Sequence, residues 1–311
     1  MGADPPVRQR NGIEASRRLV CPTACITDMA SPACSLATAW GRRPCVLPPD
    51  WLDLSPVDTD LPSVERLLRR LDESRMRVRL PGDGPASGSP RRVALRDIPD
   101  LSSHLASGQP LHLQAIDLHQ VDAGHAEMLR RFRQRLEALV PEVAHPSTQV
   151  TMGLFLSSGG AVAPFHADQE HNFLAQVAGD KKMHMFPSEL DTFPCIKREA
   201  LAADDEHVLD TYHPALEARA EVVHLVPGTT LYHPPMSPHW VDTGRASPSL
   251  SLTFSFTTPS VHRVLLLHKL NRRLRRLGLQ PQPVGRRPGV DAAKLVVARA
   301  MRALVRLQRP G

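Results

Sequence analysis

Residues 153–187 read GLFLSSGGAVAPFHADQEHNFLAQVAGDKKMHMFP, and LYHPPMSPHWVDTG at 231–244 completes the pattern. In a β-strand, residues i and i+2 project from the same face. His166 and Asp168 therefore form a pair that can hold one metal ion from a single strand. His239, just past the turn-like sequence PPMSP, is the best candidate for a third ligand. Two histidines and one carboxylate are the ligand set typical of non-haem Fe(II) sites.

Other histidines near these segments offer alternatives. His233 precedes the Pro-Pro turn and competes with His239 as third ligand. His171, in HADQEH, would suit a hydrolytic zinc site, although catalytic zinc sites usually use closely spaced ligands on a helix. A lone His-x-Asp pair is more often a structural hydrogen bond. The strand KKMHMFP, which begins at Lys181, favours a metal site, and His184 on this strand should face away from the cavity.

A longer pattern, PxHxDxxxNFxxQxxGxK, runs without a gap from Pro164 to Lys181. In these residues the chain resembles the JmjC or cupin-like Fe(II)/2-oxoglutarate-dependent oxygenases, most closely the factor-inhibiting-HIF type of asparaginyl hydroxylase. The resemblance covers about residues 111–259. It implies that Lys181 pairs with the distal carboxylate of 2-oxoglutarate. It also implies that Fe(II) is bound by His166, Asp168 and His239, since the family's third ligand follows the Pro-Pro turn.

The chain departs from the family's pattern at three positions. His112 stands in place of a tyrosine that touches the co-substrate carboxylate, and Ser255 in place of an asparagine. Ala163 stands where the relatives have a threonine that contacts the co-substrate. By position, the resemblance makes His112, Asn172 and Ser255 cofactor-binding residues beside the lysine. Asn172 and Gln176 either face inward, toward co-substrate or substrate, or are polar strand residues bonded to their neighbours.

The fold expected is mainly β with α additions: a double-stranded β-helix, the jelly-roll or cupin barrel of JmjC-like proteins, with C-terminal helices. Short alternating segments separated by turns support this expectation. We expect 172–179 and 181–187 to form a hairpin that closes at Gly179-Asp180. The predicted strands are 76–80, 110–118, 150–157, 172–179, 181–187, 220–228, 231–235, 239–243 and 249–256.

Helical periodicity marks two further segments before the metal motif. The first is 64–76, with Val64, Leu67, Leu68 and Leu71 on one face. The second begins after Asp122, a capping residue, and ends before Pro141. Its predicted apolar stripe is Met128, Leu129, Phe132, Leu136 and Leu139. Residues 188–219 read as acidic and irregular, and with Trp240 they are candidates for a substrate rim, although Trp240 equally suits packing.

Three regions follow from composition and charge. Residues 1–45 read as an irregular extension, 46–259 as the oxygenase barrel with its supporting elements, and 260–311 as a basic helical tail. The tail contains 13 of the 38 Lys and Arg residues but one of the 32 acidic residues. Amphipathic helices at 261–279 and 292–308, the second capped by Asp291, favour packing or dimerisation. The tail's charge also suits an acidic peptide, RNA or an anionic membrane surface.

Composition bounds the class of protein. A hydrophobic content of 41% is that of an ordinary globular chain. Apolar runs fall short of a bilayer span, and the N-terminus has no apolar signal region, so we expect a cytoplasmic protein that is not an integral membrane protein. The odd number of cysteines favours a reducing compartment. Cys21, Cys25, Cys34 and Cys45 match no zinc spacing and read as free thiols, and Cys195 is alone.

Three functions are weighed from this reading. The resemblance implies hydroxylation of a C–H bond in a protein or peptide side chain, with release of succinate and CO2. The basic tail favours hydroxylation of an RNA or tRNA base, which a related JmjC subfamily performs. The third is a metal-binding cupin without catalysis. Lys181 opposes this third reading, because a mere metal binder needs no carboxylate partner there. The resemblance also makes a homodimer the expected assembly, because the asparaginyl hydroxylase dimerises through C-terminal helices.

Overall fold

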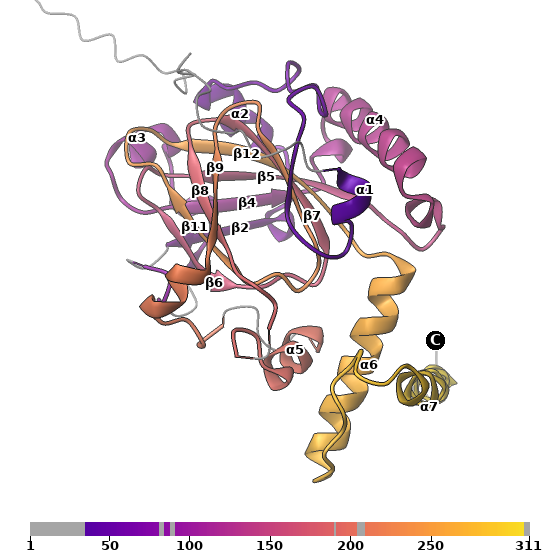
Figure 1. Ribbon diagram of the computed structural model, residues 1–311. Coiled ribbons are helices and arrows are strands. Elements are labelled where there is room, and N and C mark those ends of the chain that lie inside the picture. The colour runs from indigo at the N-terminus through magenta and orange to yellow at the C-terminus, as the bar shows by residue number, and fades with distance from the viewer. Residues whose placement is uncertain (1–34, 81–83, 88–90, 190, 204–208, 308–311) are drawn as a thin grey trace, which may run out of the picture.

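The computed structural model describes residues 35–80, 84–87, 91–189, 191–203 and 209–307, with side chains of the last helix described to 302. Two antiparallel sheets form its centre (Figure 1). In the order of hydrogen-bonded neighbours, the large sheet contains β1 (Cys45–Leu47), β10 (Thr230–His233), β7 (His171–Ala178), β12 (Ser249–Phe256), β5 (Thr151–Ser157), β4 (His112–Ile116), β2 (Met76–Leu80) and β3 (Arg91–Val93). The small sheet contains β6 (Val162–His166), β11 (His239–Thr243), β8 (Lys181–Met185) and β9 (Glu221–Leu225).

The two sheets face each other as a cupin-like jelly roll, which confirms the predicted fold class. Apolar side chains of both sheets fill the interior, and Lys181 of the small sheet reaches Ser251 of the large one. The predicted barrel is not closed by hydrogen bonding, because among the described residues the strands divide into two separate sheets. The apolar core between the sheets consists of Leu174, Met183, Met185, Val223, Leu225 and Leu231.

A second core lies on the outer face of the large sheet. Helix α4 (Ala123–Leu139) covers this face, and the Phe132 ring stacks on Phe254 with a centroid separation of 4.1 Å. Asp122 caps α4 by accepting a hydrogen bond from the His125 backbone amide, as predicted. Leu139 is 48% exposed, so the predicted apolar stripe ends at the preceding helical turn.

The predicted hairpin at Gly179 is wrong. Strand β7 pairs with β10 and β12 in the large sheet, whereas β8 pairs with β9 and β11 in the small sheet. The turn at Gly179-Asp180 thus carries the chain from one sheet to the other. Gly179 has a φ of 67°, and an added Cβ would lie 2.9 Å from Ser249 Cα and collide with the carbonyl oxygen of Pro248.

We expect Gly179→Ala to destabilise the protein by about 3 kcal/mol, because it combines a left-handed backbone with a backbone clash. Urea unfolding measures this change. Gly278→Ala is the matched control, since Gly278 has a φ of 79° but open space around an added Cβ. It should cost about 1 kcal/mol. Equal losses for the two variants would show that the close approach at Pro248 is unimportant.

The N-terminal boundary also differs from the prediction. Residues 36–45, assigned to an irregular extension, include α1 (Leu36–Ala39) and the start of β1, and Leu36 and Ala39 are buried. The Trp40 ring stacks on His171, with centroids 4.2 Å apart. Of the five cysteines, Cys45 and Cys195 are not in disulfides, while Cys21, Cys25 and Cys34 lie outside the described residues.

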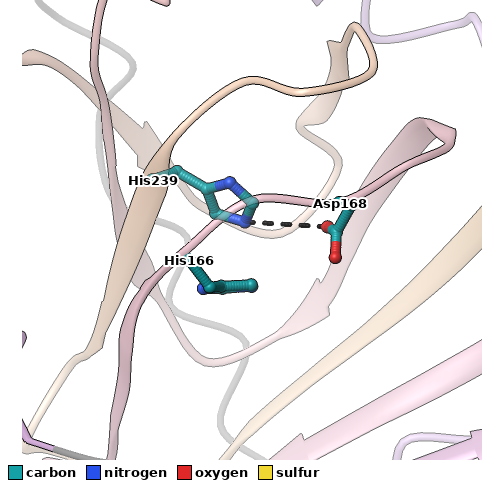
Figure 2. A group of neighbouring side chains, drawn as sticks. All are labelled: His166, Asp168 and His239. Atoms are coloured by element: carbon teal, nitrogen blue, oxygen red, sulfur yellow. Dashed lines mark ion pairs between the residues drawn. The ribbon is translucent and has the colours of Figure 1, made fainter. Parts of the chain in front are cut away.

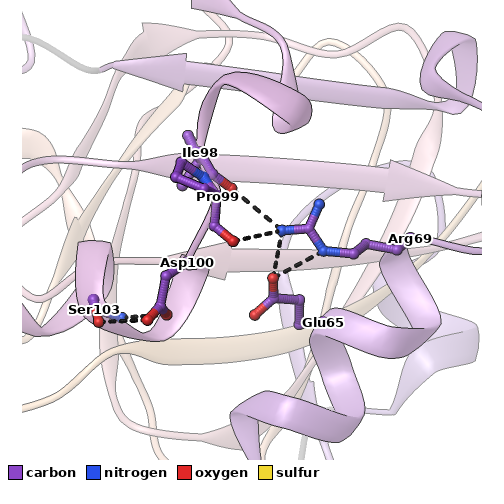
Figure 3. A network of polar contacts seen from close by, with 6 residues as sticks. All are labelled: Glu65, Arg69, Ile98, Pro99, Asp100 and Ser103. Carbon is purple, nitrogen blue, oxygen red and sulfur yellow. Dashed lines mark hydrogen bonds and ion pairs between the residues drawn. The ribbon is translucent and has the colours of Figure 1, made fainter.

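Of two short helices in this part of the chain, one ends earlier than the periodicity predicted and the other was not predicted. Helix α2 (Leu61–Leu68) stops eight residues before the predicted end, and a 3-10 turn at Glu73–Arg75 follows it. Arg69, at the end of α2, pairs with Glu65 of the same helix and donates to the carbonyls of Ile98 and Pro99, just before α3 (Leu101–Ala106) (Figure 3). The other 3-10 turns are Leu95–Asp97, Leu118–Gln120, Pro141–Ala144 and Pro214–Arg219.

The segment 188–219 is not irregular throughout. It contains α5 (Cys195–Ala202), which packs against α6 (Pro259–Arg276). The Glu199 carboxylate, buried on α5, pairs with Arg275 on α6 at 2.9 Å. Part of the predicted rim is therefore fastened to the C-terminal helices.

The basic tail forms two helices, as predicted. Helix α6 leaves the sheets and α7 (Pro288–Leu307) packs beside it (Figure 1). Asp291 does not cap α7, because the helix begins at Pro288; its carboxylate accepts a hydrogen bond from the Gly285 amide instead. Of the predicted apolar face of α6, Val264 and Leu277 are exposed. None of the helices that the structure describes is long and apolar enough to cross a bilayer.

Candidate metal centre

The predicted ligands come together at one end of the small sheet. His166 is the last residue of β6 and His239 the first of β11, and the antiparallel register places them directly opposite each other. Asp168 lies in the turn after β6, so the strand ends before it. The Met236 amide donates to the Asp168 carbonyl at 2.7 Å and holds this turn against the Pro-Pro segment. One potential ligand atom from each of the three side chains lies within 4.8 Å of the others (Figure 2).

Hydrogen bonds orient both imidazoles for metal binding. His166 Nδ1 lies 2.7 Å from the Pro164 carbonyl oxygen, and His239 Nδ1 lies 2.9 Å from that of Ser237. Because a carbonyl oxygen only accepts, each Nδ1 carries the proton and each Nε2 presents its lone pair. Burial, followed by repulsion from His166, lowers the pKa of His239 well below its ordinary value. A neutral imidazole is the form that binds metals.

Asp168 completes the donor set. Its Oδ2 lies 3.9 Å from His239 Nε2 and accepts a hydrogen bond from Asn172 Nδ2 at 3.3 Å. The Ser255 hydroxyl bonds in turn to Asn172 Oδ1. Asn172 thus contacts a predicted metal ligand, and Ser255 reaches that ligand only through Asn172. The predicted contacts of both residues with the co-substrate stay a prediction. Two neutral imidazoles and one oriented carboxylate fit a divalent transition-metal ion.

The competing histidines lie outside this cluster. The His233 ring is 4.9 Å from that of His239 by centroid, but its buried side chain is not among the three grouped ligands, and burial lowers its pKa to about 3. His171 Nδ1 lies 2.9 Å from the Tyr232 hydroxyl, on the side of the sheet where Trp40 stacks. His184 faces away from the cavity as predicted.

A polar network lies on the face of the small sheet opposite Lys181. His184 stacks on Trp240, with centroids 3.8 Å apart, and bonds to Glu217. The Trp240 indole donates to the same carboxylate at 2.7 Å. Trp240 is half-buried and packs on His184, and its role at a substrate rim stays a prediction.

Lys181 lies between the two sheets and is 3% exposed. Its Nζ donates to Ser251 Oγ at 3.1 Å, and Ser251 Oγ donates to Gln176 Oε1 at 2.7 Å. Gln176 is thus a buried polar strand residue bonded to its neighbours, which is one of the two roles predicted for it. Burial lowers the pKa of Lys181 to about 7. No carboxylate of the described residues pairs with this amine.

His112, on β4 of the large sheet, lies near Lys181 of the small sheet. Its Nδ1 is 2.9 Å from Ser157 Oγ, and its ring stacks on Phe155 at 5.3 Å. The Lys181 amine lies over the Phe155 ring, 5.8 Å from the centroid of that ring. Burial, then the charge of Lys181, lowers the pKa of His112 well below its ordinary value. A buried cation and hydrogen-bonding groups at such a place can hold an anionic ligand.

Ser251 is the residue at this site that sequence reasoning missed. Alternation in SLSLTFSF placed it on one face of a strand, but only the pairing of β12 with β7 brings it beside Gln176.

Comparison with known proteins supports the fold assignment. Residues 111–260 match the family model of the cupin-like domain. No curated protein sequence matches the chain. Among solved structures, two of YcfD, a ribosomal oxygenase from Escherichia coli, were solved in complex with cobalt and succinic acid and with cobalt and 2-oxoglutarate. They share 18% identity with this chain, at TM-scores of 0.47 and 0.49.

The alignments to YcfD cover 88% of this chain and 65% of YcfD, so the chain spans about two thirds of that protein's length. The DMSP lyase DddQ from Ruegeria pomeroyi matches with 18% identity and a TM-score of 0.23, over 35% of this chain and 38% of its own.

Proposed function

We propose that the protein is an Fe(II)- and 2-oxoglutarate-dependent dioxygenase. It would hydroxylate a C–H bond of a protein or peptide side chain and release succinate and CO2. The observation that carries the proposal is the pairing of two features in one interior: the His166, Asp168 and His239 donor set, and the buried Lys181 without a carboxylate partner among the described residues.

Each residue has a defined task in this proposal. His166, Asp168 and His239 would hold Fe(II), and the bound iron supplies the oxidising chemistry together with 2-oxoglutarate and dioxygen. Lys181 would hold the distal carboxylate of 2-oxoglutarate by a charge-assisted hydrogen bond. Asn172 and Ser255 orient Asp168, and His112 contributes a neutral ring beside the lysine. Holding the reactants in one orientation is the protein's main contribution to the rate.

Succinate release from 2-oxoglutarate tests the reaction class. The purified protein, supplied with Fe(II) and 2-oxoglutarate but no substrate, should release succinate slowly, because oxygenases of this class show uncoupled turnover. Asp168→Ala should reduce the rate to the background of free Fe(II), since it removes one of three ligands. Succinate is quantified by mass spectrometry. Equal rates for wild type and variant would contradict the site assignment.

If neither protein releases succinate, the binding of 2-oxoglutarate to the Fe(II) form is measured without oxygen. Binding to the Fe(II) form would indicate an enzyme that turns over only with its substrate. Absence of binding would favour the cupin without catalysis and would contradict the proposed function.

The C-terminal helices bear on partners and assembly. We propose that they mediate a homodimer. The amphipathic helix α7 leaves Val290, Val296 and Val297 exposed, and exposed apolar side chains that lie together mark an interaction surface. Their positive charge keeps an RNA base hydroxylase as the second candidate function. The proposal places the reaction in the cytoplasm.

A further inference from the structure

Three arginines share one face at the β2–β3 end of the large sheet. Arg77 and Arg79 are two residues apart on β2, and Arg92 of β3 lies directly opposite Arg79. Residues i and i+2 of one strand and directly opposite residues of two paired strands project from the same face of a sheet. These three side chains therefore form one group, which we call the arginine row.

The arginine row lies on the face that carries the proposed co-substrate site. On the other side of β2, Arg79 is directly opposite His112, whose ring is beside Lys181. Burial, then repulsion from Arg77 and Arg92, lowers the pKa of Arg79, while the Asp168 carboxylate acts in the opposite direction. A proposed metal ligand is thus within electrostatic reach of the Arg79 guanidinium.

The chain after β2 also approaches the metal centre. The Phe165 amide, next to His166 in the sequence, donates to the Pro85 carbonyl oxygen at 2.9 Å. The segment at Pro85, which follows β2, is therefore bonded to the strand of the small sheet that carries His166. A ligand bound at Arg79 would therefore lie within electrostatic reach of Asp168.

Within the described parts of the chain, the arginine row has no acidic partner. None of the three guanidinium groups donates a hydrogen bond or forms an ion pair there, whereas other arginines, such as Arg69, Arg133 and Arg219, are paired. Like charges directly opposite each other on a sheet are destabilising. Such a cluster becomes favourable when a ligand supplies negative charge.

We propose that the arginine row binds an acidic segment of the peptide substrate, which makes the substrate class of the proposed hydroxylase a peptide with glutamate or aspartate close to the modified residue. The inference rests on the proposed function. Strand β3 ends the large sheet, and its outer edge suits an extended peptide, whose alternate side chains would point along one face. Three guanidinium groups complement carboxylates at this spacing.

The aromatic residues favour a peptide over RNA. All 13 of them, eight Phe, three Trp and two Tyr, lie within the described residues, and each is buried or half-buried. Recognition of single-stranded RNA relies on exposed aromatic rings on which bases stack. None of these rings is in the exposed class, so the basic face is better matched to carboxylates.

Fluorescence anisotropy of the full chain tests the proposal. The probes are a labelled octapeptide of alternating glutamate and glycine, the same peptide with lysine in place of glutamate, and an octamer of uridine. We expect wild type to bind the glutamate peptide best, and Arg77→Gln/Arg79→Gln/Arg92→Gln to bind it about tenfold more weakly. The matched control Arg42→Gln/Arg43→Gln/Arg263→Gln removes three exposed arginines elsewhere and should bind within about twofold of wild type.

Three results would overturn the proposal. They are an equal loss in both triple variants, tighter binding of the RNA through the same arginines, and a loss of 2-oxoglutarate affinity as large as the loss of peptide affinity. The last would assign the arginine row to the co-substrate. Succinate release by the wild type is measured separately, so arginine-dependent peptide binding without succinate release would contradict the proposed function and not the binding surface.

Discussion

His166→Ala and His239→Ala will each weaken Fe(II) binding by more than about hundredfold, whereas His233→Ala will leave it within a few-fold of wild type. Loss of a residue that merely orients a ligand already costs about 10- to 100-fold in metal affinity, so loss of a ligand costs more. The described geometry leaves His233 outside the group whose donor atoms lie within 4.8 Å of one another. Competition with a chromophoric chelator under anaerobic conditions measures the three affinities.

The His233 variant is the sharp control in this series. It removes a buried histidine from the same neighbourhood, and its ring is 4.9 Å from that of His239. A general loss of packing would therefore weaken all three variants alike. Wild-type Fe(II) affinity in His166→Ala would contradict the ligand assignment, and a large loss in His233→Ala would move the third ligand before the Pro-Pro turn.

Lys181→Met should weaken 2-oxoglutarate binding by about two orders of magnitude while Fe(II) binding is retained. The lysine is 3% exposed, and removing one partner of a buried charged pair costs about 2–5 kcal/mol. Calorimetric titration of the anaerobic Fe(II) protein measures the co-substrate affinity. Lys182→Met is the matched control, because Lys182 is the next residue on β8 and is exposed. Equal affinities for the two variants would contradict the role of Lys181.

The same lysine predicts how 2-oxoglutarate binding depends on pH. Burial lowers the pKa of Lys181 to about 7 in the free protein, so the amine loses its proton as the pH rises above 7. A bound carboxylate favours the protonated amine and raises this pKa again. Binding therefore takes up a proton above pH 7, and the affinity should fall with rising pH, approaching about tenfold per pH unit. If the dissociation constant of 2-oxoglutarate stayed constant from about pH 6.5 to about pH 8.5, Lys181 would not be titrating in this range.

The stability of the protein without metal or co-substrate gives a second, independent test of the lowered pKa of Lys181. The unfolded chain holds the Lys181 proton up to the ordinary lysine pKa, whereas the folded chain releases it near pH 7. Between those values the unfolded state binds more protons, so this group's contribution to stability increases as the pH rises. Lys181→Met should flatten that increase, and this effect needs neither metal nor co-substrate.

Local sequence patterns predicted most of the strands and the candidate ligands. Alternation located the strands that contain Lys181, His239 and Ser255, because a two-residue period reports a sheet face directly. The capping signal at Asp122 also located the start of α4. Helix ends were predicted less well: α2 stops at Leu68 although its apolar spacing continues, because the chain turns there toward β2.

The sequence by itself therefore determined the strand-rich class, the ligand types and the unbalanced positive tail, since these depend on neighbouring residues. Only the tertiary structure decided that β7 and β8 belong to opposite sheets and that Ser251 supports Lys181. It also decided that Arg79 lies beside His112, which is 33 positions later in the chain. The physical reason is that strand pairing joins residues far apart in sequence, and its register is set by packing of the whole core and not by local periodicity.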